Sequence, residues 1–179
     1  MVFDLFNLVE GFWIIIPAYA ANGLVPLLRG KHPVDFGKIF RGQPVFGPGK
    51  TWEGIIGAGF IGALFAIIQM LAYPYLPWNS SIIPLIIVPM TPILGFFIGF
   101  GALFGDLVKS FFKRRIGVAR GRPLPFFDQI DFILGAYLFA SFLAPIKLSW
   151  VILFVIITPV FHLMANFIAY FLKVKKEPF

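Results

Sequence analysis

The sequence predicts an all-α integral membrane protein with about five transmembrane helices. Of its 179 residues, 59% are hydrophobic and only 13% are charged, whereas a soluble domain carries about 25% charged residues. The mean hydropathy is +0.90, and several apolar runs reach or approach the ~20 residues that cross a bilayer. Together these observations exclude a soluble globular enzyme and a disordered chain.

Five apolar segments are the candidate membrane helices, and proline residues interrupt several of them. Each proline removes one backbone donor, which a neighbouring group must compensate inside the membrane. The fourth segment is short, and its boundary with the fifth depends on Pro145, Lys147 and Ser149. The expected helices cover residues 11–28, 55–76, 82–104, 132–147 and 149–172.

The basic residues predict how these helices are oriented. Fourteen of the 15 Lys and Arg residues lie in three segments, which are the 29–54 loop, residues 105–131 and the tail after residue 172. Five helices place all three segments on one side, which the positive-inside rule makes cytoplasmic. We therefore expect the N-terminus outside, the C-terminus in the cytoplasm and basic cytoplasmic loops. No loop is long enough to fold alone, so residues 1–179 are expected to form one domain in the cell membrane.

Glycines recur at helical spacing within the apolar segments. Gly95 and Gly99 form a GxxxG pattern, which favours close packing of two membrane helices. Gly57, Gly59 and Gly62 have the spacing of a dinucleotide-binding fingerprint, but they lie inside an apolar run without the strand that must precede that motif. We therefore interpret these glycines as packing residues.

The segment 105–131, GDLVKSFFKRRIGVARGRPLPFFDQID, concentrates acidic and basic residues at one edge of the membrane. If the third helix continues into this segment, four polar side chains share one helical face, because their spacing is i, i+4, i+7 and i+8. They are Asp106, Ser110, Lys113 and Arg114. Asp128 and Asp131 follow as i, i+3 neighbours where the fourth helix is expected to begin.

Two interpretations of these carboxylates are open. A carboxylate at the edge of an apolar helix is costly unless a partner or a cation neutralises it. Arg114, Arg115 or Arg122 would supply structural ion pairs. A Mg²⁺ ion would instead use the carboxylate oxygens and complete its shell with substrate phosphates, whose charge the basic residues would neutralise. The pattern favours a metal and phosphate site at the cytoplasmic edge of the membrane.

Lys50 and Thr51 precede the second apolar segment on its cytoplasmic side. A helix N-terminus presents free N–H groups and the positive end of the helix dipole, which suits a phosphate. Gly47 and Gly49, on either side of Pro48, allow the backbone to approach a ligand closely. A lysine that extends to the membrane surface and a threonine cap are the structural alternative.

These residues resemble a known family, the CDP-diacylglycerol synthases. Its signature is matched by Gly105-Asp106-Leu107, Ser110, Lys113-Arg114 and Asp128-x-x-Asp131, and its second shared block by residues 49–54, GKTWEG. The stretches PAYAANGLVP, FGPGKTWEGIIGA and LPFFDQIDFILGA are similar to the archaeal branch, the CDP-archaeol synthases. The resemblance extends from about Pro17 to Gly135. One departure is that residues 123–127, PLPFF, stand where bacterial members carry a His and a Gly pair, so no nucleotide contact is transferred there.

The resemblance implies a membrane cytidylyltransferase that converts CTP and digeranylgeranylglyceryl phosphate, an isoprenoid ether lipid phosphate, into CDP-archaeol and pyrophosphate. The implied cofactor is Mg²⁺, bound by Asp106, Asp128 and Asp131. The implied phosphate-binding residues are Lys50, Thr51, Ser110, Lys113 and Arg114, and the catalytic group is Asp106, Lys113, Asp128 and Asp131. The expected partners are CTP, the lipid phosphate and the bilayer, with no nucleic acid and no obligate protein partner.

A small transporter or channel for a phosphorylated or cationic solute is the alternative function. Such a protein would use the same charges, but it needs polar residues through the full depth of the bilayer, and the outer halves of the apolar segments are nearly free of them. A packing subunit of a larger complex explains the glycines and prolines but gives the clustered acidic residues no role. We therefore expect an enzyme.

Overall fold

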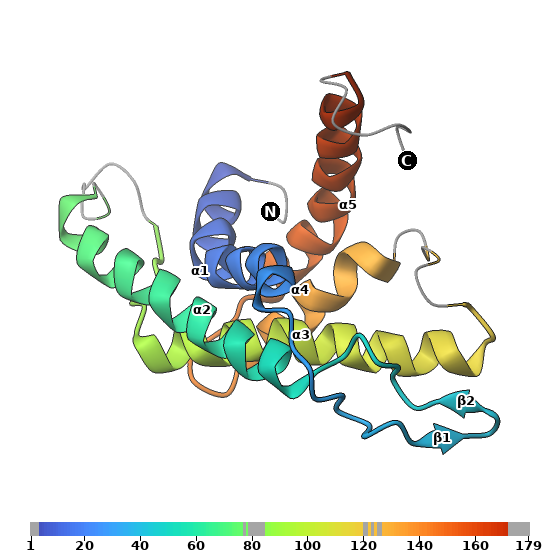
Figure 1. Ribbon diagram of the computed structural model, residues 1–179. Coiled ribbons are helices and arrows are strands. Elements are labelled where there is room, and N and C mark those ends of the chain that lie inside the picture. Colours follow the sequence, from blue (N-terminus) through green and yellow to red (C-terminus); the bar gives the residue numbers. More distant parts are fainter. Residues whose placement is uncertain are drawn as a thin grey trace.

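A computed structural model of the chain describes residues 4–76, 78, 85–119, 122, 124 and 127–171, and consists mainly of helices (Figure 1). The helices are α1 (Leu5–Leu24), α2 (Trp52–Ala72), α3 (Pro92–Arg115), α4 (Phe127–Ala140) and α5 (Leu148–Phe171). The 3₁₀ turns η1 (Val25–Leu28) and η2 (Tyr73–Tyr75) extend α1 and α2, and the two short strands β1 (Ile39–Phe40) and β2 (Gln43–Pro44) form a hairpin. The prediction of an all-α membrane protein with five helices is confirmed.

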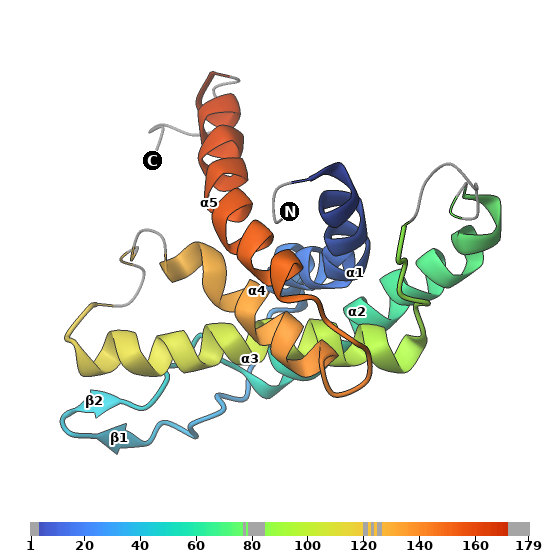
Figure 2. The ribbon, with the colours of Figure 1, turned by 180° about the vertical axis from the view of Figure 1, so that it is seen from behind.

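The pair formed by α2 and α3 depends on glycines at the contact. A Cβ atom on Gly62 would lie only 3.0 Å from the Cα of Gly99, and one on Gly59 would lie 2.5 Å from the ring of Phe96. Only residues without a side chain let the two backbones approach so closely. The glycines at 59, 62 and 99 are therefore packing residues, as the sequence predicts, and α2 lies beside α3 in both ribbon views (Figures 1 and 2).

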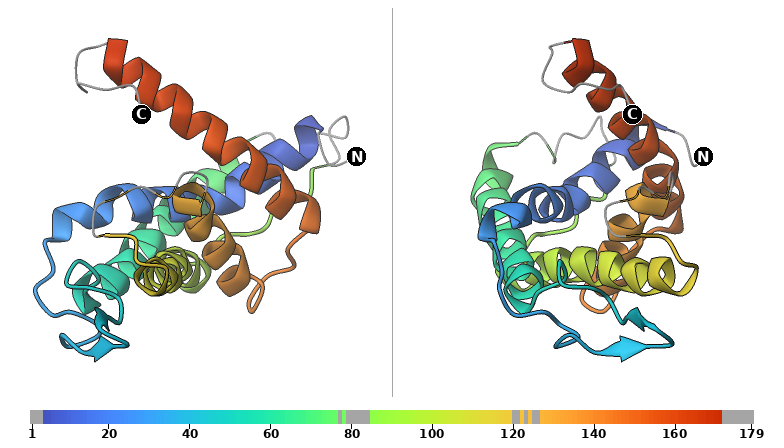
Figure 3. Two further views of the ribbon diagram at one scale, coloured as in Figure 1. Left: turned by 90° about the vertical axis from the view of Figure 1, so that its right-hand side faces the viewer. Right: turned by 45° about the vertical axis from the view of Figure 1, so that its right-hand side comes forward.

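The core lies where α1, α4 and the first half of α5 pack against α3 and the extended residues 85–90. The indole Nε1 of Trp13 donates to the carbonyl oxygen of Val88 at 3.1 Å, and the Nε2 of Gln69 donates to the carbonyl oxygen of Trp13 at 2.6 Å. These hydrogen bonds satisfy polar groups that the membrane would leave unpaired. Beyond this region the C-terminal half of α5 projects away from the other helices (Figure 3).

A buried carboxylate joins three segments at the N-terminal end of α1. Glu10 is only 2% exposed. Its oxygens accept hydrogen bonds from the backbone N–H of Ile86 at 2.6 Å and the indole Nε1 of Trp150 at 3.1 Å, and they form an ion pair with Lys147. This Glu10 cluster links α1 to the extended segment and to the start of α5.

The boundaries of three predicted helices are wrong. The first helix begins at Leu5 rather than at residue 11. The third helix begins at Pro92 rather than at residue 82, because Thr91 caps it by accepting from the N–H of Leu94 at 3.2 Å and proline is favoured in the first turn. The fourth helix covers Phe127–Ala140 rather than 132–147. Among the described residues, three helical segments are long and apolar enough to cross a membrane, namely Leu5–Leu28, Trp52–Tyr75 and Pro92–Arg115, and α5 contributes a shorter apolar stretch, Leu148–Phe161.

Candidate active site

A polar cavity of about 530 Å³ opens beside the C-terminal half of α3, the helix that extends beyond the apolar core as the sequence predicts. Its walls come from α3, from residues 44–50 after the β1–β2 hairpin and from the start of α4. The charged and hydroxyl side chains that line it are Lys50, Asp106, Lys109, Ser110, Lys113, Arg114, Arg122 and Asp128. Five of these eight side chains are cationic, so the cavity suits a multiply charged anion.

Lys109 is the centre of the charge arrangement. Its Nζ lies 3.1 Å from an oxygen of Asp106, 3.1 Å from an oxygen of Asp128 and 2.8 Å from an oxygen of Asp131. One ammonium group therefore brings together carboxylates from α3 and α4. Lys109 was not among the predicted site residues, although its position at i+3 from Asp106 places it on the same helical face.

Lys113 fixes Asp128 and the chain that precedes α4. Its Nζ donates to both oxygens of Asp128, at 3.1 and 3.0 Å, and to the carbonyl oxygen of Arg122 at 2.7 Å. The backbone N–H of Leu124 donates to Asp128 as well, at 2.6 Å. The Asp128 carboxylate is therefore held at the wall of the cavity by a side chain of α3 and by the backbone that precedes α4.

The ion pair of Lys50 with Asp106 connects the N-terminus of α2 to α3. These two residues, with Pro48 and Gly49, also line a second polar cavity of about 410 Å³, which contains Arg29 and Thr51. The Oγ1 of Thr51 accepts the N–H of Gly54 at 3.2 Å, so its own O–H remains able to donate to a ligand. The two cavities therefore meet at the Lys50–Asp106 pair.

Two residues hold the hairpin segment that forms one wall of the first cavity. The guanidinium of Arg115 donates to the carbonyl oxygens of Phe40 and Pro44, the latter at 2.5 Å, and lies 5.1 Å from the centre of the Phe111 ring. The hairpin therefore lies along the C-terminal half of α3, which is visible from both sides of the molecule (Figures 1 and 2). Neither the hairpin nor the role of Arg115 was predicted.

Asp35 holds the other end of the same segment. Its oxygens accept the backbone N–H groups of Gly37 at 3.0 Å and of Phe46 and Gly47 at 2.9 Å each. Burial acts to raise the pKa of the Asp35 carboxyl, but the three N–H donors stabilise the carboxylate more strongly, so its pKa lies below the ordinary value. Asp35 is therefore charged at neutral pH and organises the turn before Lys50.

The structure brings together most of the predicted site residues. Six of them, Lys50, Asp106, Ser110, Lys113, Arg114 and Asp128, line the first cavity. Thr51 lines the second cavity instead, and Asp131 is joined to the cluster through Lys109. Among the described residues, the ion pairs of the three carboxylates are made with lysines rather than with the arginines that the structural alternative invoked.

Comparisons with known proteins decide the family. The family model described as CarS-like, CDP-archaeol synthase, matches residues 2–179. The chain belongs to the CDP-archaeol synthase family. It is 38% identical to the CDP-archaeol synthase of Pyrococcus furiosus over 96% of this chain and 98% of the relative, and 41% identical to that of Methanococcoides burtonii over 92% and 99%.

A solved structure of an intramembrane enzyme for archaeal membrane lipids biosynthesis is similar to the whole arrangement. The two chains superpose with a TM-score of 0.73 at 31% identity, covering 88% of this chain and 93% of that chain. The present CDP-archaeol synthase family member is therefore a membrane-embedded enzyme, a cytidylyltransferase by its family. This membership favours the enzyme over the transporter that the sequence analysis kept as its alternative.

Proposed function

We propose that the chain transfers the cytidylyl group of CTP to digeranylgeranylglyceryl phosphate, giving CDP-archaeol and pyrophosphate at the cytoplasmic face of the cell membrane. The family supports the reaction, and the observation that carries it to particular residues is the cationic cavity beside α3. The cavity lies at the end of a membrane-length helix. A soluble nucleotide and a lipid phosphate have to meet at such a place, because neither can enter the phase of the other.

In this reaction an oxygen of the lipid phosphate attacks the α-phosphorus of CTP. A new P–O bond forms, the bond from the α-phosphorus to the bridging oxygen breaks, and pyrophosphate leaves with that oxygen. The lipid phosphate is already ionised at neutral pH, so no general base is required. Both reactants are anions, so the work of the protein is to neutralise charge and to position the two groups in line.

In this proposal the residues that line the two cavities neutralise or bind the phosphate groups of the substrates. Lys113 and Arg114 would neutralise the triphosphate, and Ser110 would donate a hydrogen bond to it. Lys50 and Thr51 would bind phosphate where the two cavities meet. Lys109, which the sequence analysis left out, would hold Asp106, Asp128 and Asp131 close together through its three ion pairs.

The donor set suits Mg²⁺ as the cofactor. Asp106 and Asp128 line the cavity and Asp131 lies behind them, and all three offer the oxygen ligands that this cation prefers. Among the described residues, no group of three acidic or histidine side chains is arranged to hold a metal by itself. A Mg²⁺ ion commonly takes one or two protein carboxylates and completes its shell with substrate phosphates, where it would offset the charge of the triphosphate. A rise in Tm on adding Mg²⁺ with CTP, lost in Asp106→Asn, would support this assignment without an activity assay.

The reaction is tested with purified protein, CTP, Mg²⁺ and digeranylgeranylglyceryl phosphate, and the CDP-lipid is measured by mass spectrometry. A parallel reaction contains diacyl phosphatidic acid. Product with the isoprenoid lipid and much less with the diacyl lipid supports both the reaction and the specificity. Product in both reactions would support the reaction but contradict the specificity for the isoprenoid lipid. If folded protein forms no product in either reaction, the proposed function is contradicted.

The proposed orientation is tested by cysteine labelling, since the chain contains no cysteine. Lys38→Cys in the exposed hairpin segment should react with a membrane-impermeant maleimide only from the cytoplasmic side. Ser141→Cys, in the exposed connection between α4 and α5, should react only from outside. Labelling of both variants from one side would overturn the orientation.

A further inference from the structure

An apolar groove of about 580 Å³ lies between α3 and α4. Aromatic and aliphatic side chains line it, including Val108, Phe112 and Ile116 from α3 and Phe127, Leu134 and Leu138 from α4. From Phe127 to Leu138 the groove follows α4 for about 16 Å, at 1.5 Å per residue. Most of these side chains are more than one third exposed, so the groove is open along its length.

The groove runs beside a close contact of α3 and α4, and Gly105 and Gly135 at that contact line it. A Cβ atom on Gly105 would lie 2.9 Å from the carbonyl carbon of Asp131, and one on Gly135 would lie 2.9 Å from the backbone nitrogen of Gly105. This contact brings the two backbones together at the glycines. On either side of these glycines the groove is lined by side chains, from Ile116 and Phe127 to Phe104 and Leu138.

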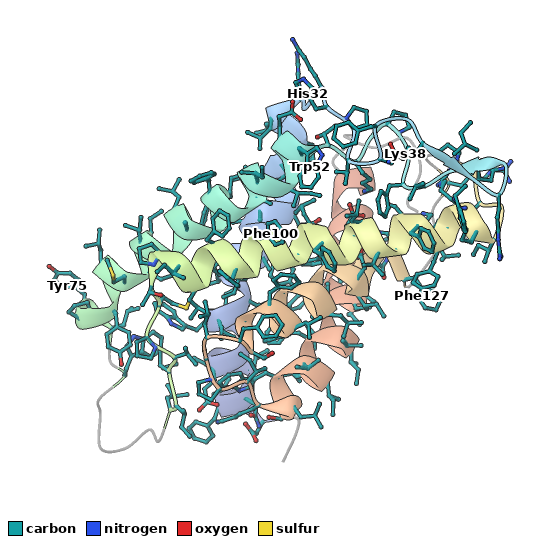
Figure 4. The ribbon with its side chains drawn as sticks, turned by 90° about the horizontal axis from the view of Figure 1, so that it is seen from below. His32, Lys38, Trp52, Tyr75, Phe100 and Phe127 are labelled. Carbon is teal, nitrogen blue, oxygen red and sulfur yellow. The ribbon has the colours of Figure 1, made fainter. Side chains whose placement is uncertain are left out.

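Charged residues of the active site lie partway along this groove. Lys109 and Lys113 line both the apolar groove and the polar cavity, and Asp131 lines the groove as well. Figure 4 shows Phe127 on one side of α3 and Lys38, in the hairpin segment, on the other. The two lysines therefore lie between an aqueous cavity on one flank of α3 and an apolar groove on the other flank.

We infer that the α3–α4 groove is the binding site for one apolar chain of the lipid phosphate, whose phosphate group contacts Lys109 and Lys113. This inference rests on the proposed function, because it takes the lipid phosphate as the second substrate. The phosphate would then reach the CTP cavity while the chain stays in the membrane. An apolar helix face alone would bind any lipid. The ammonium groups of Lys109 and Lys113 in the wall of this groove pair with carboxylates, and their contact with a phosphate would favour a lipid with an anionic head group.

A photo-crosslinking experiment on the wild-type protein tests the occupant directly. The probe is a lipid phosphate that carries a diazirine in one chain, and the matched control is the same lipid without the phosphate. We expect crosslinks within 104–116 and 127–138 for the phosphate probe, with at least about tenfold fewer for the control. Equal labelling by both probes, or labelling confined to α1, α2 or α5, would overturn the inference.

A matched pair of substitutions tests the effect on catalysis. Leu138 in the groove and Leu64 on α2 are both 55% exposed apolar residues on membrane helices. Leu138→Trp should raise the KM for the lipid phosphate by about tenfold, because the indole fills the groove, while the Kd for CTP stays unchanged. Leu64→Trp should change neither constant. Equal lipid KM values in the two variants would overturn the inference.

The outcomes separate this inference from the proposed function. Crosslinking needs no turnover, so a phosphate-dependent crosslink in the groove without any CDP-lipid product would contradict the function and support the groove. Normal product formation with crosslinks outside the groove would support the function and contradict the groove. If Leu138→Trp fails to fold, the crosslinking of the wild-type protein still decides the question.

Discussion

Two clusters of charged side chains lie near opposite ends of α1, and they differ in burial and in what surrounds them. The Glu10 cluster encloses one carboxylate of α1 with a backbone N–H from the extended segment and with a lysine and an indole N–H from the start of α5. The cluster around Lys109 holds three carboxylates from two helices and faces cavities that contain further cations. An ionisable side chain inside a membrane protein costs free energy, so the presence of each cluster requires its own explanation.

The comparison shows that burial and ion pairing alone do not identify a reaction centre. The oxygens of Glu10 are saturated by donors whose positions fix the fold, and the result is a link between helices. The carboxylates around Lys109 share one ammonium group and lie next to open volume, so a substrate or a metal ion can enter their surroundings. Access to a cavity separates the second cluster from the first.

The largest expected effect on turnover is at Asp128, which belongs to the cluster beside the cavity. Asp128→Asn should lower turnover by about a hundredfold to a thousandfold, because the substitution removes a charge at the cavity but little volume. CDP-lipid formation measures turnover, and the Tm in detergent measures folding. Near-normal turnover in a folded variant would remove Asp128 from the reaction centre.

A smaller effect of a different kind is expected at Glu10. Glu10→Gln should lower the free energy of unfolding by about 2 kcal/mol, because a buried charged hydrogen-bond acceptor is lost. Turnover per folded molecule should remain that of the wild type. Thermal unfolding and CDP-lipid formation are measured on the same preparation. Loss of turnover at unchanged stability would contradict a purely structural role for Glu10, because it would place this residue in the reaction centre.

Arg115→Lys tests whether the hairpin is part of the reaction region. Lysine retains the charge but not the planar fork that donates to two carbonyl oxygens. We expect the KM for CTP to rise by about tenfold and kcat to change little, because the hairpin supplies a wall of the CTP cavity. Arg41→Lys, at a cation that lies 5.4 Å from the Phe40 ring centre, is the control and should have little effect. A fall in kcat without a change in KM would contradict a positioning role.

The smallest effect concerns pH and Asp35. The pKa of this carboxyl is lowered in the folded protein, so its stabilising contribution is complete above the ordinary aspartate pKa of about 3.9 and is lost as the pH falls through the lower folded value. Hydrogen exchange at the amides of Phe46 and Gly47 should distinguish the wild type from Asp35→Asn at pH 6, and the difference should shrink as the pH falls below the ordinary aspartate pKa. A difference that grows as the pH falls would contradict this account.

The sequence predicts much of the fold and of the site because both depend on local patterns. Apolar runs give the helices, GxxxG spacing gives the α2–α3 contact, and helical periodicity places Asp106, Ser110 and Lys113 on one face. The start of α3 was misplaced because apolar composition outweighed the Thr91 cap, although that signal is local and visible in the sequence.

The missed residues depend on contacts between distant segments. Arg115 acts through backbone carbonyl oxygens more than 70 positions earlier, and a backbone acceptor leaves no pattern in the sequence. Lys109 was visible as one of several lysines, but its contact with Asp131 depends on how closely α3 and α4 approach at Gly105 and Gly135. The α3–α4 groove follows from the same approach.

The central claim is that the cluster around Lys109 transfers a cytidylyl group to a lipid phosphate. The most direct measurement follows CTP labelled at either the α- or the γ-phosphorus through one incubation with the lipid phosphate. The account predicts that the α-label enters the lipid fraction and the γ-label appears in pyrophosphate. Transfer of the γ-label to the lipid, or retention of both labels in soluble nucleotides by folded protein, would contradict it.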